Sequence, residues 1–185
     1  AMADESWDEL REVLTDVCLG QPQCVVHRDF HSRNIMCLPN DRLGLIDFQD
    51  AVVGPITYDP VSLLKDCYIQ WPRSDQLRWL EAYRQMLLSA GVEVPGESAF
   101  IRDFDLVGLR RHLRVLGVFA RLFLRDGKSN YLNDLPLVLA YTKEVLALYE
   151  SEPAIAAFSK WFEGVVMPRI AAQEWHQQAA KKLGA

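Results

Sequence analysis

Apolar residues recur at helical spacing along most of this chain. Between Ser6 and Leu19 they form one stripe that Gly20 follows, which predicts an amphipathic helix ending at the glycine. After Tyr58 the pattern stays helical, with interruptions at polar, glycine and proline positions. It predicts helices over about 60–70, 74–90, 98–125, 134–149 and 153–183.

Three residues mark expected helix boundaries. Asp59 precedes Pro60 and is expected to cap the helix over 60–70, because a carboxylate can accept the unpaired N–H groups of a first turn. Ser74 is expected to cap the next helix in the same way. Pro168 should kink or split the last helix, since proline lacks an N–H and crowds the preceding turn.

The first 57 residues are mixed. Residues 24–26 form a short apolar run that predicts a strand, and runs at 35–38 and 43–46 flank the turn sequence 39–42, which predicts a hairpin. The expected fold class is therefore α+β and predominantly α-helical. We expect a single domain of residues 1–185, with a mixed part (1–57) and a helical part (58–185).

Composition and charge exclude several classes of protein. Half of the 185 residues are hydrophobic and 24% are charged, which is typical of a globular chain. The net charge of −5 predicts no nucleic-acid partner, and the lack of a long apolar run predicts no membrane span. The acidic N-terminal segment does not resemble a signal peptide, so we expect a cytoplasmic protein.

The four cysteines form no CxxC pair, and zinc binding by Cys24, His27, His31 and Cys37 is disfavoured by their spacing.

One stretch carries recognisable chemistry. The sequence His-Arg-Asp-Phe-His-Ser-Arg-Asn begins at His27 and matches the pattern H-R-D-x-x-x-x-N of kinase catalytic loops. Asp47-Phe48 follows the second predicted hairpin strand, where a kinase holds its metal-binding aspartate. Phosphoryl transfer needs a positioned nucleophile and Mg²⁺ to neutralise phosphate charge. Asp29 can accept the proton of an acceptor hydroxyl, while Asn34 and Asp47 offer the hard oxygen ligands that Mg²⁺ prefers.

A plainer interpretation of the same residues remains open. In it His27 is a core histidine, Asp29 and Asn34 are turn residues, and Asp47 caps local backbone. The hairpin that separates Asn34 from Asp47 favours the kinase interpretation, because it is the expected context of the two motifs.

The sequence resembles the aminoglycoside phosphotransferase and choline kinase-like branch of the protein kinase-like fold. Gln49 in place of the glycine of D-F-G, followed by Asp50, is similar to small-molecule kinases rather than protein kinases. Residues 27–34, 47–54, 58–68 and 111–136 further resemble bacterial N-acetylmuramate/N-acetylglucosamine anomeric sugar kinases. The resemblance implies an ATP-dependent and Mg²⁺-dependent sugar kinase with Asp29 as catalytic base, Asn34 and Asp47 as metal ligands, and His27 as a structural brace of the loop.

The resemblance covers only the C-terminal lobe of such a kinase. No glycine-rich loop or strand lysine precedes His27, so an N-terminal nucleotide-binding lobe is an expected partner and these residues alone are expected to be inactive. Asp50 is a possible substrate contact or, equally, a cap of local backbone amides. Arg121 shares a helix face with Arg110, Arg114 and Arg125. A solvated face is the favoured explanation of that pattern, and contact of Arg121 with an anionic acceptor, such as the lactyl carboxylate of N-acetylmuramate, is the alternative. Four tryptophans are expected to pack in the core, although one in the acceptor cleft would fit: Trp71, Trp79, Trp161 and Trp175. The alternatives are an aminoglycoside acceptor and a non-catalytic binding module.

Overall fold

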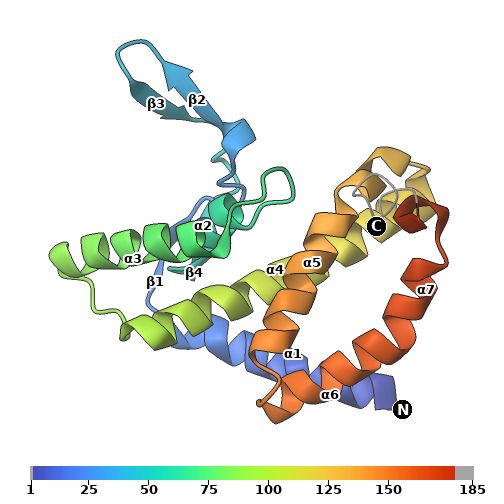
Figure 1. Cartoon of the computed structure of the whole chain (residues 1–185). Helices are drawn as coiled ribbons and strands as arrows, with labels where there is room; N and C mark the ends of the chain where they lie inside the picture. Colours follow the sequence, from blue (N-terminus) through green and yellow to red (C-terminus); the bar gives the residue numbers. More distant parts are fainter. Residues whose placement is uncertain (1, 178–185) are drawn as a thin grey trace. The chain divides into compact units, whose positions relative to one another are not determined.

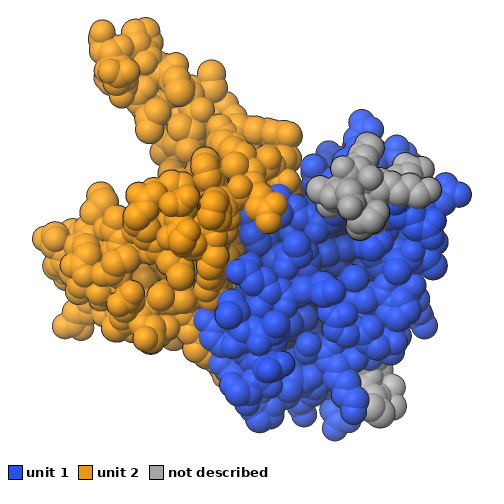
Figure 2. Space-filling model, in the orientation of Figure 1, with its two compact units in different colours: residues 1–14, 109–185 blue, residues 15–108 orange. Residues whose placement is uncertain are grey.

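The structure is a computed structural model that describes residues 2–177 of the chain. It divides into two compact units, one formed by residues 1–14 and 109–185 and the other by residues 15–108 (Figure 2). Helices α1 (Met2–Gly20) and α4 (Glu97–Asp126) each run from one unit into the other. This division leaves the expected organisation as a single domain a prediction.

The unit of residues 15–108 contains two small antiparallel sheets. Strand β2 (Ile35–Leu38) pairs with β3 (Arg42–Leu45), which confirms the predicted hairpin to within one residue (Figure 1). The turn between them is closed by Asn40 and Asp41, whose φ angles of 63° and 55° suit the short polar side chains of Asn and Asp. Strand β1 (Gln23–Val26) pairs with β4 (Val52–Pro55), a strand that the hydrophobic pattern did not indicate.

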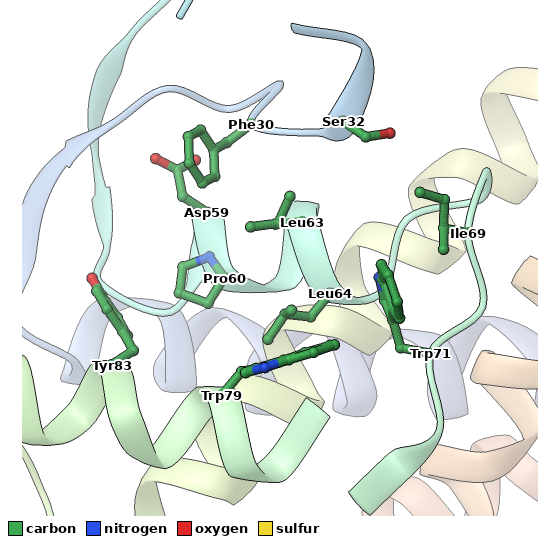
Figure 3. A pocket seen from close by; sticks show the side chains of 10 residues that line it. All are labelled: Phe30, Ser32, Asp59, Pro60, Leu63, Leu64, Ile69, Trp71, Trp79 and Tyr83. Carbon is green, nitrogen blue, oxygen red and sulfur yellow. The ribbon is translucent and has the colours of Figure 1, made fainter. Parts of the chain in front are cut away.

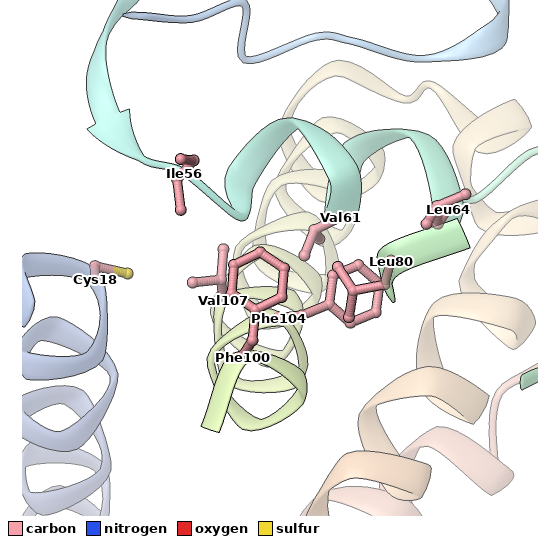
Figure 4. Packing of buried hydrophobic residues seen from close by; sticks show 8 residues of the cluster. All are labelled: Cys18, Ile56, Val61, Leu64, Leu80, Phe100, Phe104 and Val107. Carbon is pink, nitrogen blue, oxygen red and sulfur yellow. The ribbon is translucent and has the colours of Figure 1, made fainter. Parts of the chain in front are cut away.

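The helices of this unit enclose one apolar core. Helices α2 (Tyr58–Leu64), α3 (Arg73–Ser89) and the first half of α4 surround it, together with the end of α1. Its buried members come from all four helices and from the segment after β4 (Figure 4): Cys18, Ile56, Val61, Leu64, Leu80, Phe100, Phe104 and Val107. Phe100 and Phe104 of α4 each expose 1% or less of their surface. Their burial in this core stabilises the packing of α4 against α2.

Helix α2 differs from its predicted form at both ends. Thr57 occupies the N-cap position and Asp59 lies within the first turn, so the expected capping role of Asp59 was wrong. The helix ends at Leu64, where residues to about 70 had been expected. The Asp66 carboxylate accepts the N–H of Cys67 at 2.8 Å, and such local bonds compete with continuation of a helix. Ser74 likewise lies inside α3, which begins at Arg73 after Pro72.

The other unit is helical in its described part. Helix α5 (Leu135–Leu148) confirms the predicted helix over 134–149, and α6 (Pro153–Trp161) begins the last predicted segment. A π-helical turn, Phe162–Val166, then leads into α7 (Met167–Ala171). The turn precedes Pro168: the N–H of Met167 bonds to the carbonyl of Phe162, five residues back, and widens the helix where the proline would otherwise crowd it. Residues 178–183 of the predicted helix lie outside the described residues. Among residues 2–177, no helix combines the length and the apolar character needed to cross a membrane.

Candidate functional site

The loop that follows β1 is held by a carboxylate of helix α2. Both oxygens of Asp59 accept backbone N–H groups, from His27 at 2.7 Å and from Arg28 at 3.1 Å. The negative charge in the first turn of α2 is favourable, because the N-terminal N–H groups of a helix carry partial positive charge. Asp59 therefore joins the start of the His27–Asn34 segment to the helix. Sequence reasoning missed this contact, since nothing in the pattern pairs residues 31 and 32 positions apart.

Arg28 adopts a backbone conformation that needs such support. Its φ angle is 74°, in the left-handed region that non-glycine residues rarely occupy. The Ser62 hydroxyl is fully buried and lies 3.2 Å from the carbonyl oxygen of Arg28 and 3.0 Å from that of Tyr58, so its single proton serves one or the other. Asp59 and Ser62 thus hold the N–H and the carbonyl of Arg28 from the same helix.

His27 connects the loop to the end of strand β3. Its Nε2 lies 2.9 Å from the carbonyl oxygen of Ile46, the residue before Asp47. A carbonyl only accepts, so Nε2 carries the hydrogen of this bond. The Nδ1 atom is buried and has no hydrogen-bond partner within the described part of the chain. The predicted bracing histidine therefore lies where it can hold the loop against the strand that leads to Asp47.

Asn34 is hydrogen-bonded to the residue before Asp47 at the base of the β2–β3 hairpin. The N–H of Ile46 donates to the Asn34 carbonyl at 3.1 Å, which places Asn34 beside the residue that precedes Asp47. The Asn34 amide nitrogen donates to the Asp29 carbonyl at 2.9 Å, and this directs the nitrogen inward and leaves the amide oxygen available. Asp47 has a φ of 65°, and one of its carboxylate oxygens accepts Gln49 Nε2 at 2.7 Å. An amide oxygen and a carboxylate fit Mg²⁺, which prefers oxygen ligands and keeps several of its own waters.

Asp29 is held by its backbone carbonyl. Its carbonyl accepts both the Asn34 side chain and the N–H of His31, while its carboxylate is exposed and has no hydrogen-bond partner among residues 5–177. Asp50 is exposed, and its carbonyl accepts a hydrogen bond from Arg28 Nη1 at 3.3 Å. The chain thus holds the backbone of Asp29 firmly and leaves its carboxylate open to a ligand.

Arg121 belongs to a different part of the chain. It is exposed on α4, in the unit that comprises residues 109–185, whereas the loop is in the unit of residues 15–108. Its role as a substrate contact stays a prediction. Within the described residues, no group of three or more His, Cys, Asp or Glu side chains is arranged to hold a metal ion, and this includes the Cys24/His27/His31/Cys37 combination.

A cavity of about 570 Å³ opens beside the loop (Figure 3). Phe30 and Ser32 form its loop side, and Trp71 and Trp79 form the opposite wall with their rings perpendicular and 5.1 Å apart. The remaining lining comes from α2, α3 and the segment between them: Asp59, Pro60, Leu63, Leu64, Ile69 and Tyr83. Such a volume is within the usual range of small-molecule sites. Trp71 and Trp79 are therefore half-buried and line this cavity. Trp161 and Trp175 are also half-buried, but they do not line it.

Tyr83 is the one phenol at this cavity. It donates a hydrogen bond to the Ile56 carbonyl at 3.2 Å. Burial, with smaller contributions from Cys24 and Asp59, raises the pKa of Tyr83 to about 12. Burial and the nearby Asp59 charge also raise the pKa of the Cys24 thiol. Both groups therefore stay protonated at neutral pH.

The far end of α2 is anchored by buried charges. Lys65 Nζ donates to Asp105 at 2.8 Å, and both side chains are fully buried. Arg73 binds the same carboxylate through two nitrogens. Burial alone would raise the pKa of Asp105, but the hydrogen bond from Arg73 and the charges of Lys65 and Arg73 outweigh it and hold that pKa below its ordinary value. Helix α2 is thus fixed at one end to α3 and α4 and carries Asp59 at the other.

The chain is similar to several known proteins. The model of the phosphotransferase enzyme family matches residues 1–100. Three curated proteins, each named N-acetylmuramate/N-acetylglucosamine kinase, are similar to this chain. The protein from Pseudomonas putida is 46% identical over 143 residues, that from Neisseria meningitidis 43% over 144, and that from Pseudomonas aeruginosa 40% over 142. Each match covers 76–77% of this chain and 42–43% of the relative, so the chain spans less than half the length of the curated relatives it matches.

These matches establish the family. The chain belongs to the phosphotransferase enzyme family, and its mainly helical fold with small antiparallel sheets is a portion of the kinase-like fold predicted from the sequence.

Proposed function

We propose that this member of the phosphotransferase enzyme family serves the transfer of the ATP γ-phosphoryl group to a hydroxyl of a small amino sugar. The acceptor we favour is the anomeric hydroxyl of N-acetylmuramate or N-acetylglucosamine, because three relatives at 40–46% identity carry those sugars in their names. The observation that carries the proposal is the braced loop. It keeps the Asp29 carboxylate open while Asn34 and the segment before Asp47 are hydrogen-bonded together.

Each residue of the loop has a proposed part in the reaction. The Asp29 carboxylate accepts the proton of the sugar hydroxyl as the hydroxyl oxygen forms a bond to the γ-phosphorus and the bond from that phosphorus to the ADP oxygen breaks. Asn34 and Asp47 would hold Mg²⁺, which neutralises phosphate charge when bound. His27, Asp59 and Ser62 are positioning residues, since they contact the loop backbone and the strand end.

The remaining parts of a kinase are proposed to come from outside these residues. A nucleotide-covering loop and a phosphate-binding lysine supply much of the electrostatic positioning in this reaction. We therefore expect the 185 residues alone to fold and to bind sugar weakly, with almost no ATP affinity and no turnover. Apolar side chains on β1 and β4, among them Val25 and Val53 at 76% and 72% exposure, are surfaces that a further lobe would cover.

The cavity favours an uncharged or anionic sugar over an aminoglycoside. A polycationic acceptor calls for several free carboxylates, whereas the cavity offers only Asp59, whose two oxygens already accept backbone N–H groups. Its aromatic wall of Trp71 and Trp79 suits the apolar face of a sugar ring.

The proposal is tested in a protein of full family length. This chain replaces the matching 143-residue segment of the Pseudomonas putida kinase, and the chimaera is incubated with ATP, Mg²⁺ and a panel of acceptors. We expect phosphorylation of N-acetylmuramate and N-acetylglucosamine and none of an aminoglycoside. The product is detected by ³¹P NMR. The unmodified relative shows that the assay works. A folded chimaera that phosphorylates neither sugar would contradict the proposal, and one that binds ATP and sugar without turnover would favour a non-catalytic binding module.

A further inference from the structure

Arg33 is held in an unusual way immediately before Asn34. Its guanidinium carbon lies 3.4 Å from the centroid of the Tyr68 ring, so the planar group stacks on the ring face. The His31 ring meets the same tyrosine edge-on, with centroids 5.6 Å apart and an interplanar angle of 90°. Tyr68 follows α2 in the chain, and it therefore joins the catalytic-loop segment to the same helix that carries Asp59.

The stacked guanidinium is open to a ligand. Arg33 is exposed and forms no ion pair with an acidic side chain of residues 5–177. Stacking restricts the rotation of the side chain but leaves its in-plane N–H groups directed outward, in a fork that matches a carboxylate. Arg73, Arg78 and Arg84 of the same unit differ, because each pairs with a protein carboxylate. Arg33 is thus a preorganised cation without a protein counter-ion in the described part of the chain.

The residues next to Arg33 and Tyr68 in the chain line the cavity. Ser32 and Ile69 both line the cavity, and Arg33 and Tyr68 are their respective neighbours in sequence. On the other side, Phe30 lines the cavity and adjoins Asp29. A ligand in the cavity therefore lies against an aromatic wall, and the loop residues that it meets, Phe30 and Ser32, directly adjoin Asp29 and Arg33 in the chain.

These features fit an acceptor with an apolar body and one carboxylate. We propose that Arg33, supported by Tyr68, binds the carboxylate of an acidic N-acetylated sugar and so determines preference for N-acetylmuramate over N-acetylglucosamine. The two sugars differ by a lactyl ether that carries the carboxylate. This inference rests on the proposed function, because it assigns the acceptor of the same site. It gives to Arg33 the contact with an anionic acceptor group that the helix-face pattern offers as an alternative for Arg121.

The test is an NMR titration of the ¹⁵N-labelled 185-residue chain with each sugar. Wild-type protein is expected to bind N-acetylmuramate more tightly than N-acetylglucosamine, with a shift of the Arg33 Nε–H resonance caused by N-acetylmuramate alone. Arg33→Gln should weaken N-acetylmuramate binding by roughly 10- to 100-fold, the usual range for a hydrogen bond between charged groups. It should leave N-acetylglucosamine binding within about twofold, because that sugar has no group for the guanidinium.

Two further variants distinguish the bidentate geometry of the Arg33 guanidinium from a general effect of its charge. Arg33→Lys keeps the charge but loses the bidentate geometry, so its loss should be intermediate. Arg42→Gln removes an equally exposed arginine from strand β3 and should change neither affinity. Thermal unfolding confirms that each variant is folded.

The outcomes distinguish the inference from the function on which it rests. If wild-type protein binds both sugars and Arg33→Gln changes both affinities equally or neither, the proposed function stands and the specificity role of Arg33 is wrong. If folded wild-type protein binds neither sugar, the proposed acceptor is wrong and the inference is overturned with it.

Discussion

The two bonds that Asp59 makes to the loop lead to a quantitative prediction for Asp59→Asn. The substitution keeps the size of the side chain but leaves one acceptor oxygen in place of two. The N–H groups of His27 and Arg28, at 2.7 and 3.1 Å from the carboxylate, then compete for that oxygen, and one of them faces an amide NH₂. A bond to a charged acceptor contributes about 1.5–3 kcal/mol, and the bond that survives loses its charge assistance. Because Asp59 is half-buried and water can replace part of the loss, we expect a local cost of roughly 2–3 kcal/mol.

The assay is native-state hydrogen exchange of the backbone amides. A local cost of roughly 2–3 kcal/mol corresponds to exchange about 30- to 150-fold faster at His27 and Arg28, while amides in the middle of α4 change little. The left-handed backbone of Arg28 adds to the effect, since the strained conformation persists only while its neighbours hold it. Asp75→Asn is the matched control: it removes a half-buried carboxylate that pairs with Arg78 in the same unit and should leave both amides unchanged. Unaltered exchange in Asp59→Asn would refute the view that Asp59 holds the loop.

Two further predictions concern ionisable groups near α2. Asp105→Asn should destabilise the chain by about 3–5 kcal/mol in chemical denaturation, because it leaves the buried Lys65 without its counter-charge. Because the pKa of Asp105 is lowered by folding, the stability that Asp105 contributes is fully present above the pKa of the carboxyl in the unfolded chain, near 4. This stability is lost as the pH falls through the lower pKa of the folded chain. If the stability of Asp105→Asn falls with acid as steeply as that of wild type, this account of Asp105 is wrong. Tyr83, with a pKa raised to about 12, should stay protonated to higher pH than an ordinary phenol near 10, so its stabilising effect is complete below pH 10 and lost between about 10 and 12. Ultraviolet titration of wild type against Tyr83→Phe measures it, and a difference spectrum that develops near pH 10 would show that the phenol is not shielded.

The hairpin and the motif spacing were predictable because they depend on local signals. Short apolar runs on either side of a Pro-Asn-Asp turn specify β2 and β3, and the short distance between Asn34 and Ile46 then follows from strand pairing. The helices over 98–125 and 134–149 were likewise predicted, since long periodic patterns are dominated by the burial of one face.

The contacts that brace the loop were not predictable, because they join distant segments. Asp59 has the sequence context of a cap, and only the folded backbone shows that its carboxylate reaches the N–H groups of His27 and Arg28. Strand β4 was not predicted because the run at 52–55 is short and contains Gly54. The pairing of the strands favours glycine at this position, because a Cβ at Gly54 would lie 2.9 Å from the Val26 side chain on the paired strand.

The cavity was also beyond the sequence pattern. Trp71 and Trp79 have the spacing of core residues, and packing against the core is part of what Trp79 does. The stacking of Arg33 on Tyr68 depends on where the chain turns after α2 ends at Leu64, six residues before the predicted end. A residue type at helical spacing indicates a face of a helix, but not which segment later lies over that face.

The measurement that tests the account most directly is the turnover of the full-length chimaera with Asp29→Asn. With N-acetylmuramate, ATP and Mg²⁺, the variant should show kcat lowered by roughly 10²- to 10⁴-fold, the usual effect of losing a general base, and a sugar KM within about threefold of the unmodified chimaera. Asp41→Asn, at an exposed hairpin position with a positive φ that asparagine also accepts, should retain full turnover. If Asp29→Asn turns over at a near-native rate, Asp29 is not the base and the central claim for this loop is wrong.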